Sequence, residues 1–285
     1  MDVVMPSVVG VLGGGRMGAG IAHSFLLAGS QVIVVERDDE SARAAQESVE
    51  RDLRKSLERG AVQGSLEELT GRLRTSVDHV DFAHAELVIE AVPESWDLKV
   101  HALQEVESHL SANAWLATNT SSLSVDDLAG QLSNPERFCG LHFFNPVPAS
   151  KLVEVVLSKH TRQELRELSV GWVEGLGKTP VVVHDSPGFA SSRLGLVIAL
   201  EAIRMVEEGV ASPESIDDAM VLGYKFPIGP LALTDVVGLD VRLGIAEYLE
   251  SKLGDRFTPP PLMRAMVARN ELGRKTGRGF YRYGE

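Results

Sequence analysis

The stretch VVGVLGGGRMGAGIAHSFLLAG, residues 8–29, reads as a short apolar strand, a glycine-rich turn and an amphipathic helix. In the turn, Gly13 allows a tight bend, Gly15 lets a pyrophosphate approach the backbone, and Gly18 lets the helix pack close to the strand. The N–H groups at the start of the helix supply hydrogen bonds and a partial positive charge to phosphates. The stretch therefore predicts a dinucleotide-binding unit, and the alternative is a glycine-rich turn with no ligand.

An acidic residue closes the second apolar run, QVIVVE at residues 31–36. In dinucleotide-binding folds an acid at this position accepts hydrogen bonds from the adenine ribose hydroxyls, so we predict that role for Glu36. Its negative charge would repel a 2′-phosphate, which favours NAD over NADP as the cofactor. Arg37 follows directly and leaves three alternatives open: it weakens this preference, stacks over the adenine, or lies in solvent.

Short Val, Ile and Leu runs alternate with longer helical patterns over the first 184 residues. This alternation is typical of a parallel sheet with helices on both faces. It predicts an α/β fold of the Rossmann type, with a doubly wound, mostly parallel sheet. The expected strands are residues 8–12, 31–36, 87–92, 115–119, 138–143, 152–156 and 179–184.

Residues 39–74 are longer than a simple crossover between strands. The segment ESARAAQESVERDLRKSLERG has helical spacing and many charges, which predicts a long, solvated helical arm that projects from the sheet. After VVVHDSPGF the strand-like runs stop and helical patterns follow, one of them with Ser212 as N-cap and Pro213 at its first position. We therefore expect an NAD-binding domain at 1–185 and an all-α C-terminal domain at 186–285.

The formal charge of the 285-residue chain is −12, so its surface would repel nucleic acid and anionic lipid. The longest apolar runs fall far short of the roughly 20 residues that cross a bilayer, and no membrane partner is expected. The N-terminal residues lack a basic leader, which favours a cytoplasmic location. The single cysteine, Cys139, lies in an apolar run and is expected to be a core residue, and no metal site is predicted.

Two polar segments follow predicted strands: AVPES at residues 91–95 and NTSSLSV at residues 119–125. Open sheets of this class bind ligands at the carboxyl ends of their strands. Part of the polarity is structural, because Ser124 can form a capping box with Asp127 at the start of the next helix. Ser121 lies before that cap, and we expect it to meet a ligand.

The segment HFFNPVPASKLVEVV, residues 142–156, places the carboxylate of Glu154 in an otherwise apolar strand. A buried carboxylate without a partner is unfavourable or takes up a proton. We expect its partner to be His142, whose tautomer Glu154 would fix while the other imidazole nitrogen takes a substrate proton. The alternative for Glu154 is a surface ion pair, and Asn145 is either a ligand contact or a turn former.

Seven segments together make the chain resemble the 3-hydroxyacyl-CoA dehydrogenase family, in particular its single-function 3-hydroxybutyryl-CoA dehydrogenase members. They are GGGRMGAGIA, LVIEAVPES, NTSSL, GLHFFNPVP, KLVEVV, DSPGF and GRKTGRGFY, in family order and over almost the entire chain. The resemblance implies NAD-dependent oxidation of (S)-3-hydroxyacyl-CoA to 3-ketoacyl-CoA, or the reverse. It also implies an acyl-CoA substrate, a short acyl chain and a homodimer.

The resemblance further implies roles for individual residues. His142 and Glu154 match the catalytic dyad, and Ser121 and Asn145 match positions at the substrate and the nicotinamide. The positions that match cofactor contacts outside the glycine-rich turn are Glu94, Lys99 and Lys275. Arg59, in the predicted arm, falls roughly at a basic position near the CoA moiety, with a solvated charge as the alternative.

One position departs from the family pattern. Where the family has an asparagine before arginine after SPGF, this chain has Ser192 before Arg193. The resemblance implies that Ser192 lies near the catalytic histidine and the substrate carbonyl. A hydroxyl is shorter than an amide and cannot bridge two partners in the same way, so we expect an altered rate or substrate choice.

Two other functions remain open. Dehydrogenases of related fold that act on free hydroxy acids, such as gulonate or carnitine, tend to have proline after the histidine, whereas Phe143 follows His142 here. A non-catalytic NAD-binding protein, like the lens crystallins derived from this fold, would be favoured by loss of the dyad. The apolar helix GLVIALEAIRMV supports either a dimer interface or an internal core.

Overall fold

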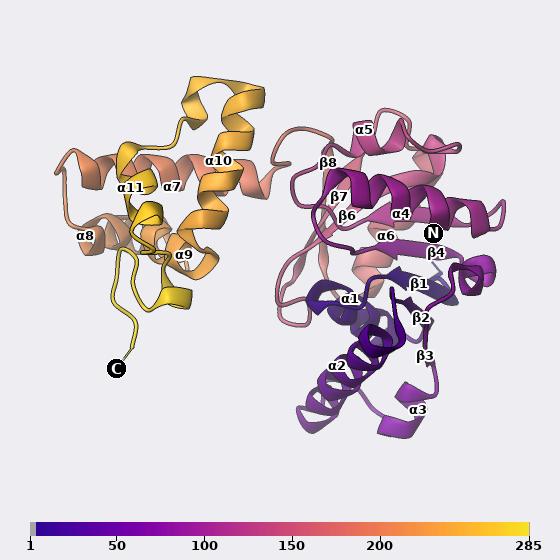
Figure 1. Ribbon diagram of the computed structural model, residues 1–285. Helices are drawn as coiled ribbons and strands as arrows, with labels where there is room; N and C mark the ends of the chain where they lie inside the picture. The colour runs from indigo at the N-terminus through magenta and orange to yellow at the C-terminus, as the bar shows by residue number, and fades with distance from the viewer. Residues whose placement is uncertain (1–3, 285) are drawn as a thin grey trace. The chain divides into compact units, whose positions relative to one another are not determined.

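The computed structural model describes residues 4–284 and divides into two compact units, Met1–Ser186 and Pro187–Glu285 (Figure 1). The first unit contains a sheet with helices around it, and the second is helical. The predicted fold class, a Rossmann-type α/β unit followed by an all-α unit, is confirmed.

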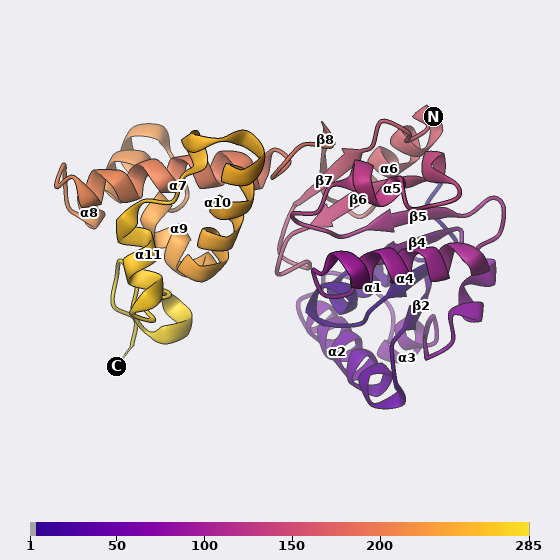
Figure 2. The same ribbon diagram turned by 45° about the horizontal axis from the view of Figure 1, so that its top comes forward.

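Within residues 4–186, an eight-stranded sheet has the strand order β3-β2-β1-β4-β5-β6-β7-β8 (Figure 1, Figure 2). In that sheet every neighbouring pair is parallel except β6 with β7. The order reverses at β1 and β4, and doubly wound sheets bind ligands at such a reversal. The strands are β1 (Val8–Leu12), β2 (Gln31–Val35), β3 (Leu73–Ser76), β4 (Leu87–Glu90), β5 (Trp115–Thr118), β6 (Phe138–Phe143), β7 (Leu152–Leu157) and β8 (Thr179–His184).

Helices connect these strands, as a parallel sheet requires. The α-helices are α1 (Arg16–Leu27), α2 (Asp39–Glu58), α3 (Leu66–Thr70), α4 (Trp96–His109), α5 (Val125–Ala129) and α6 (Gln163–Gly175). Two short 3₁₀-helices, η1 (His79–His84) and η2 (Pro135–Arg137), complete the described part of the unit.

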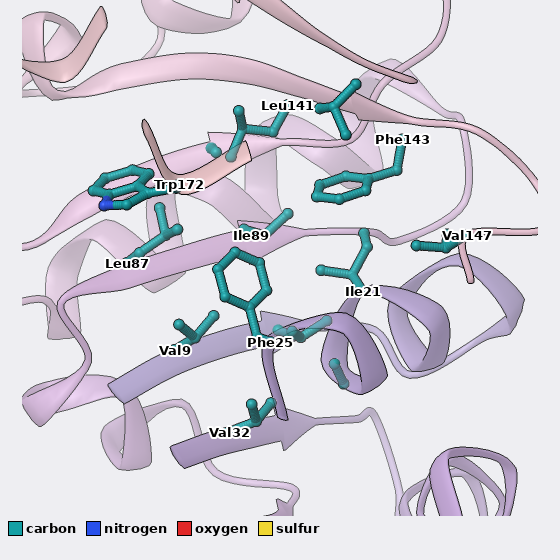
Figure 3. Close-up of a cluster of buried hydrophobic side chains, with 14 of the residues drawn as sticks. Val9, Ile21, Phe25, Val32, Leu87, Ile89, Leu141, Phe143, Val147 and Trp172 are labelled. Carbon is teal, nitrogen blue, oxygen red and sulfur yellow. The ribbon is translucent and has the colours of Figure 1, made fainter. Parts of the chain in front are cut away.

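One face of the sheet is covered by α1 and α6, as Figure 3 shows. Ile21 and Phe25 of α1 and Trp172 of α6 pack against strand side chains. The strand residues labelled on this face are Val9, Val32, Leu87, Ile89, Leu141 and Phe143. Phe82 of η1 packs against Gly10, where an added Cβ would lie 2.5 Å from the ring. Strands buried on both faces read as continuous apolar runs, which is why the sequence predicts them well.

All seven predicted strands are confirmed, with small differences at their ends. The eighth, β3, was not predicted. It is an edge strand that pairs with β2, as in Val32 opposite Leu73, and none of its four residues is fully buried. Its sequence, LRTS, lacks the apolar run that marks a covered strand. The segment predicted as helical at about 39–74 contains two helices, α2 and α3, and β3 begins at its end with Leu73.

The long helix predicted after residue 39 is confirmed as α2, which has 20 residues. It does not stand free of the sheet, however. A buried stripe packs it against α1 and β3, while its charged residues are mostly exposed or half-buried. The stripe consists of Ala42, Ala45, Val49, Leu53 and Ser56. At its end, the Ser56 hydroxyl is hydrogen-bonded at 2.8 Å to Nε2 of His23 on α1. Helix α2 is therefore part of the packed unit.

We predict that His23 makes the first unit sensitive to acid. Burial lowers the pKa of His23, although Asp52 opposes the shift. The unfolded chain takes up a proton at this histidine below about pH 6.5, while the folded chain resists it, so stability should fall as the pH drops below that value. His23→Gln should make the thermal melting temperature decline less between pH 7 and pH 5. His101→Gln, at an exposed histidine, is the control, and an unchanged decline in His23→Gln would refute the prediction.

The second unit is built from helices within residues 187–284. They are α7 (Ser191–Glu207), α8 (Pro213–Asp218), the π-helix η3 (Ala219–Gly223), α9 (Pro230–Val237), α10 (Leu239–Leu253), η4 (Asp255–Phe257), α11 (Pro261–Ala268) and η5 (Arg274–Thr276). Ser212 caps α8 as predicted, since its hydroxyl accepts a hydrogen bond from the N–H of Ser215. Across residues 4–284, every helix is too short or too polar to cross a bilayer.

The apolar helix GLVIALEAIRMV forms most of α7, and one of its faces is internal core. Leu196, Leu200 and Ile203 are fully buried in that core, whereas Leu194 is 62% exposed.

Two buried carboxylates bind backbone N–H groups of other segments in this unit. Asp217 accepts hydrogen bonds from the first turn of α9, and Asp235 accepts them from backbone N–H groups of the GRKTGRGFY segment. That segment therefore has a structural role in its own unit.

Candidate active site

The glycine-rich turn has the geometry that a phosphate needs. Gly13 has a φ of +89°, and a Cβ on Gly18 would lie 1.7 Å from the carbonyl oxygen of Gly13. A Cβ on Gly15 would meet no atom within 4 Å, so this position faces open space at the start of α1. The first turn of α1 contains no acidic residue that would oppose an anion. Gly13 and Gly18 therefore shape the turn, and Gly15 leaves room for a ligand.

Glu36 lies directly after β2 and is hydrogen-bonded to the glycine-rich turn. Its Oε1 accepts a hydrogen bond from the N–H of Gly14 at 2.6 Å, and its Oε2 accepts one from the N–H of Arg37 at 3.2 Å. The side chain of Arg37 is 83% exposed and pairs with Asp38 at 3.1 Å. This exposed position fits both a side chain in solvent and one that stacks over the adenine, and the alternatives for Arg37 stay open.

A cleft of about 820 Å³ lies along the carboxyl edge of the sheet. Its size fits a cofactor. The cleft brings together eight of the predicted site residues from five separate segments of the chain. They are Gly13, Gly15, Glu36, Glu94, Lys99, Ser121, His142 and Asn145. Gly18 lies under the turn, and Glu154 lies behind His142.

The predicted dyad forms at the end of this cleft. His142 and Glu154 are directly opposite each other in the antiparallel pair of β6 and β7, and Nδ1 of His142 lies 2.8 Å from Oε2 of Glu154. Glu154 is fully buried and His142 is 6% exposed. The ring of Phe144 lies 4.4 Å from the imidazole, centroid to centroid. A buried carboxylate holds an imidazole in one orientation, as general acid–base chemistry requires.

Glu94 accepts several hydrogen bonds from the loop that follows β5. Its Oε1 accepts hydrogen bonds from the hydroxyl of Thr120 at 2.6 Å and from the backbone N–H groups of Ser121 and Ser122, both at 2.9 Å. Burial alone would raise the pKa of Glu94, but the charge of Lys99 and these hydrogen bonds outweigh it and lower the pKa. Glu94 is therefore an anion that positions Ser121 in the cleft wall.

Two polar residues at or beside the site, Glu90 and Asn119, were not predicted. Glu90, the last residue of β4, is fully buried and accepts hydrogen bonds from Lys99 at 2.7 Å and from the hydroxyl of Thr118 at 2.6 Å. Asn119 follows β5 and its Oδ1 accepts from the N–H of Phe143 at 2.8 Å, which ties β5 to the end of β6. A signal for Glu90 exists, since it is a carboxylate in the apolar run LVIEAV, as Glu154 is in LVEVV.

Besides Gly18 and Glu154, three predicted residues lie outside the cleft's lining. Arg59 is the C-cap of α2 and is exposed. Ser192 is in the first turn of α7, and Lys275 is in η5, so both belong to the second unit. Nζ of Lys275 donates a hydrogen bond to Oδ2 of Asp240 at 2.6 Å. The roles of these residues stay predictions.

The family models match nearly the whole chain. The NAD-binding domain of 3-hydroxyacyl-CoA dehydrogenase matches residues 8–186, and the C-terminal domain of the same family matches residues 188–283. The chain belongs to the 3-hydroxyacyl-CoA dehydrogenase family. The resemblance inferred from the sequence is confirmed, and so are the oxidoreductase class and NAD as the cofactor.

Members of this family with similar sequences and structures cover the chain almost end to end. A probable 3-hydroxybutyryl-CoA dehydrogenase of Deinococcus radiodurans is 41% identical, over 96% of this chain and 99% of its own. The mitochondrial hydroxyacyl-coenzyme A dehydrogenase of Sus scrofa is 38% identical, over 96% and 90%. The crystal structure of (S)-3-hydroxybutyryl-CoA dehydrogenase from Ralstonia eutropha has a TM-score of 0.94 and 38% identity, and the match covers 98% of this chain and 100% of that one.

We predict that Glu36 sets the preference of this dehydrogenase for NADH over NADPH. Glu36→Ser should remove the repulsion of the 2′-phosphate and change the ratio of kcat/KM for the two cofactors by about tenfold or more towards NADPH, the loss of one close like-charge contact. Steady-state rates with each cofactor measure the ratio. Glu36→Gln separates charge from structure, because its amide oxygen can still accept from Gly14. If neither variant shifts the ratio, Glu36 has only the structural role.

Proposed function

We propose that this chain catalyses the NAD-dependent oxidation of (S)-3-hydroxyacyl-CoA to 3-ketoacyl-CoA, or the reverse, with short acyl chains such as 3-hydroxybutyryl. The observation that carries the proposal is the buried pair of His142 and Glu154 at the end of the cleft. The relatives named 3-hydroxybutyryl-CoA dehydrogenase support the short acyl chain.

Oxidation of a secondary alcohol removes a hydroxyl proton and a hydride, and the two need different acceptors. Bound NAD supplies the hydride acceptor. His142 is the base: with Nδ1–H donated to Glu154, the lone pair is on Nε2, which takes the hydroxyl proton. Glu154 stabilises the imidazolium that results. In the reductive direction the same imidazolium returns the proton to the carbonyl oxygen.

The remaining residues of the cleft bind and orient. We propose that the N-terminus of α1 and Gly15 hold the pyrophosphate, and that Glu36 accepts hydrogen bonds from the adenine ribose. Ser121 and Asn145 line the same cleft as His142 and are proposed to hold the substrate and the nicotinamide. Glu94 keeps Ser121 in place through the loop after β5.

The proposal also assigns roles to residues of the second unit and to Arg59. Ser192 is proposed to lie at the substrate carbonyl in place of an asparagine, Lys275 to contact the cofactor, and Arg59 of the first unit to meet the CoA moiety. Residues 186–285 would contribute substrate binding and a homodimer interface, and 1–185 would bind NAD. Leu194 and Val197, both exposed on α7, are consistent with an interface. The cytoplasmic location stays a prediction.

The direct test is the oxidation of NADH by purified protein with acetoacetyl-CoA, followed at 340 nm. Parallel reactions with longer 3-ketoacyl-CoA esters, a dicarboxylyl one included, give the chain-length preference. Free acetoacetate and oxidised gulonate are the competing substrates. Turnover of the free acids alone would replace this proposal with a hydroxy-acid dehydrogenase, and NADH binding without turnover of any substrate would indicate a non-catalytic protein.

A further inference from the structure

Three charged side chains form a cluster between β4 and α4. Nζ of Lys99 donates to Oε1 of Glu90 at 2.7 Å and lies 3.4 Å from Oε2 of Glu94. The side chains of Glu90 and Lys99 are 0% and 1% exposed, and that of Glu94 is 33% exposed. We call these residues the charge triad. Two carboxylates and one ammonium give it a net charge of −1.

The ammonium of Lys99 is held by groups of its own chain. It donates hydrogen bonds to Glu90 and, at 3.0 Å, to the carbonyl oxygen of Val92, and it forms an ion pair with Glu94. Glu90 accepts two further hydrogen bonds, from the N–H of Val92 and the hydroxyl of Thr118. The inner pair thus acts on the cleft through its charge, and Glu94 is its exposed end.

Stability alone does not explain a buried pair of this kind. Removing two charges from water costs free energy that their attraction often fails to recover, and apolar replacements of similar volume are commonly as stable. Buried, interacting charges next to a cleft are instead typical of functional sites. The triad borders the cleft, because Glu94 and Lys99 both line it and Glu94 bonds to Ser121 in the same wall.

A fixed charge in this wall distinguishes the two forms of the cofactor. The nicotinamide ring is a cation in NAD⁺ and neutral in NADH, while the rest of the molecule is the same. We propose that the charge triad strengthens binding of NAD⁺ relative to NADH, so that Glu90, which is fully buried and outside the cleft's lining, is a positioning residue that keeps the net charge at −1. This inference rests on the NAD-binding role of the cleft and adds to it the control of the oxidised-to-reduced affinity ratio.

The test changes the charge of the triad without removing its outer carboxylate. Glu90→Gln keeps the shape of the side chain, and its amide oxygen can still accept from Lys99 and the N–H of Val92, but it makes the triad neutral. It should weaken NAD⁺ binding relative to NADH by about tenfold, because the attraction of one unit of charge for the cation is lost, and a tenfold change corresponds to about 1.4 kcal/mol. The double variant Glu90→Gln/Lys99→Met returns the net charge to −1 and should restore the wild-type ratio. Dissociation constants come from NADH fluorescence and from displacement of NADH by NAD⁺.

These variants distinguish an effect of the triad's charge from an effect of damage to the fold. A variant that is merely disrupted would not be rescued by a second buried substitution, so recovery in the double variant supports the triad. Glu136→Gln, which neutralises a partly exposed carboxylate paired with Arg162 at 3.2 Å, is the matched control and should leave the ratio unchanged. If Glu90→Gln does not fold, the double variant alone remains a test, because the wild-type ratio is expected for it.

Two outcomes would overturn the inference: an unchanged ratio in Glu90→Gln, or a ratio in the double variant that differs from wild type by about tenfold. Neither outcome affects the proposed function. That function fails separately, when the wild-type protein binds NADH but turns over no 3-ketoacyl-CoA, or binds no NADH.

Discussion

Replacing His142 by alanine is expected to lower kcat with acetoacetyl-CoA by about a thousandfold, with little change in NADH affinity. A positioned general acid–base contributes roughly 10² to 10⁴ to the rate, and within the described cleft wall His142 is the imidazole paired with a fully buried carboxylate. The hydride would still have its acceptor, but the proton would have to pass to water. Steady-state rates and NADH fluorescence measure the two effects.

The control for this variant tests folding and histidine chemistry together. His160→Ala removes an exposed histidine that follows β7 and should keep wild-type turnover. The thermal melting temperature of His142→Ala should fall, because Glu154 stays buried without this partner, so rates are measured at a temperature where the variant is still folded. A His142→Ala protein that is folded and retains normal kcat would remove the basis of the proposed mechanism.

Replacing Glu154 by glutamine is expected to lower kcat by about a hundredfold or more. The amide has nearly the same shape, but it carries no charge to stabilise the imidazolium. It also offers Nδ1 either an oxygen or an NH₂ group, and the second choice puts the imidazole in the wrong tautomer. NADH affinity should be retained, because Glu154 lies behind His142 and is fully buried.

Glu174→Gln is the matched control for Glu154→Gln, since it removes a carboxylate from the exposed side of α6 in the same unit. It should leave both kcat and stability unchanged. Glu154→Ala should cost more stability than Glu154→Gln, because it leaves Nδ1 of His142 buried without this partner. Equal kcat in Glu154→Gln and wild type would mean that the imidazole needs no anionic partner.

The sequence predicted most of the sheet for a physical reason. Strands such as VIVV in β2 and FCGLHF in β6 are covered on both faces and must be apolar throughout, so they are visible without any alignment. β3 is only half-covered at the edge of the sheet, and its LRTS sequence resembles a loop. α2 was read as solvated because its mean composition is charged, while its buried stripe is narrow.

The candidate site was predicted from residues whose types are unusual for their surroundings. His142 and Glu154 fall into this group, and their contact follows from pairing between adjacent strands. Glu90 belongs to this group as well, but it was not predicted because the sequence suggested no histidine partner for it. The ammonium of Lys99 also donates to a backbone carbonyl, that of Val92, and a contact to the backbone cannot be predicted from the residue types.

The antiparallel pairing of β6 with β7 has a consequence for how this chain can vary. His142 faces Glu154 because of the register in which the two buried strands pair. In a strand pair the side chains alternate between faces, so a slip of one residue would turn Glu154 to the opposite side of the sheet. The connection between the strands can therefore vary over evolutionary time, whereas a residue inserted or deleted within either strand would separate the pair even if every catalytic side chain were retained.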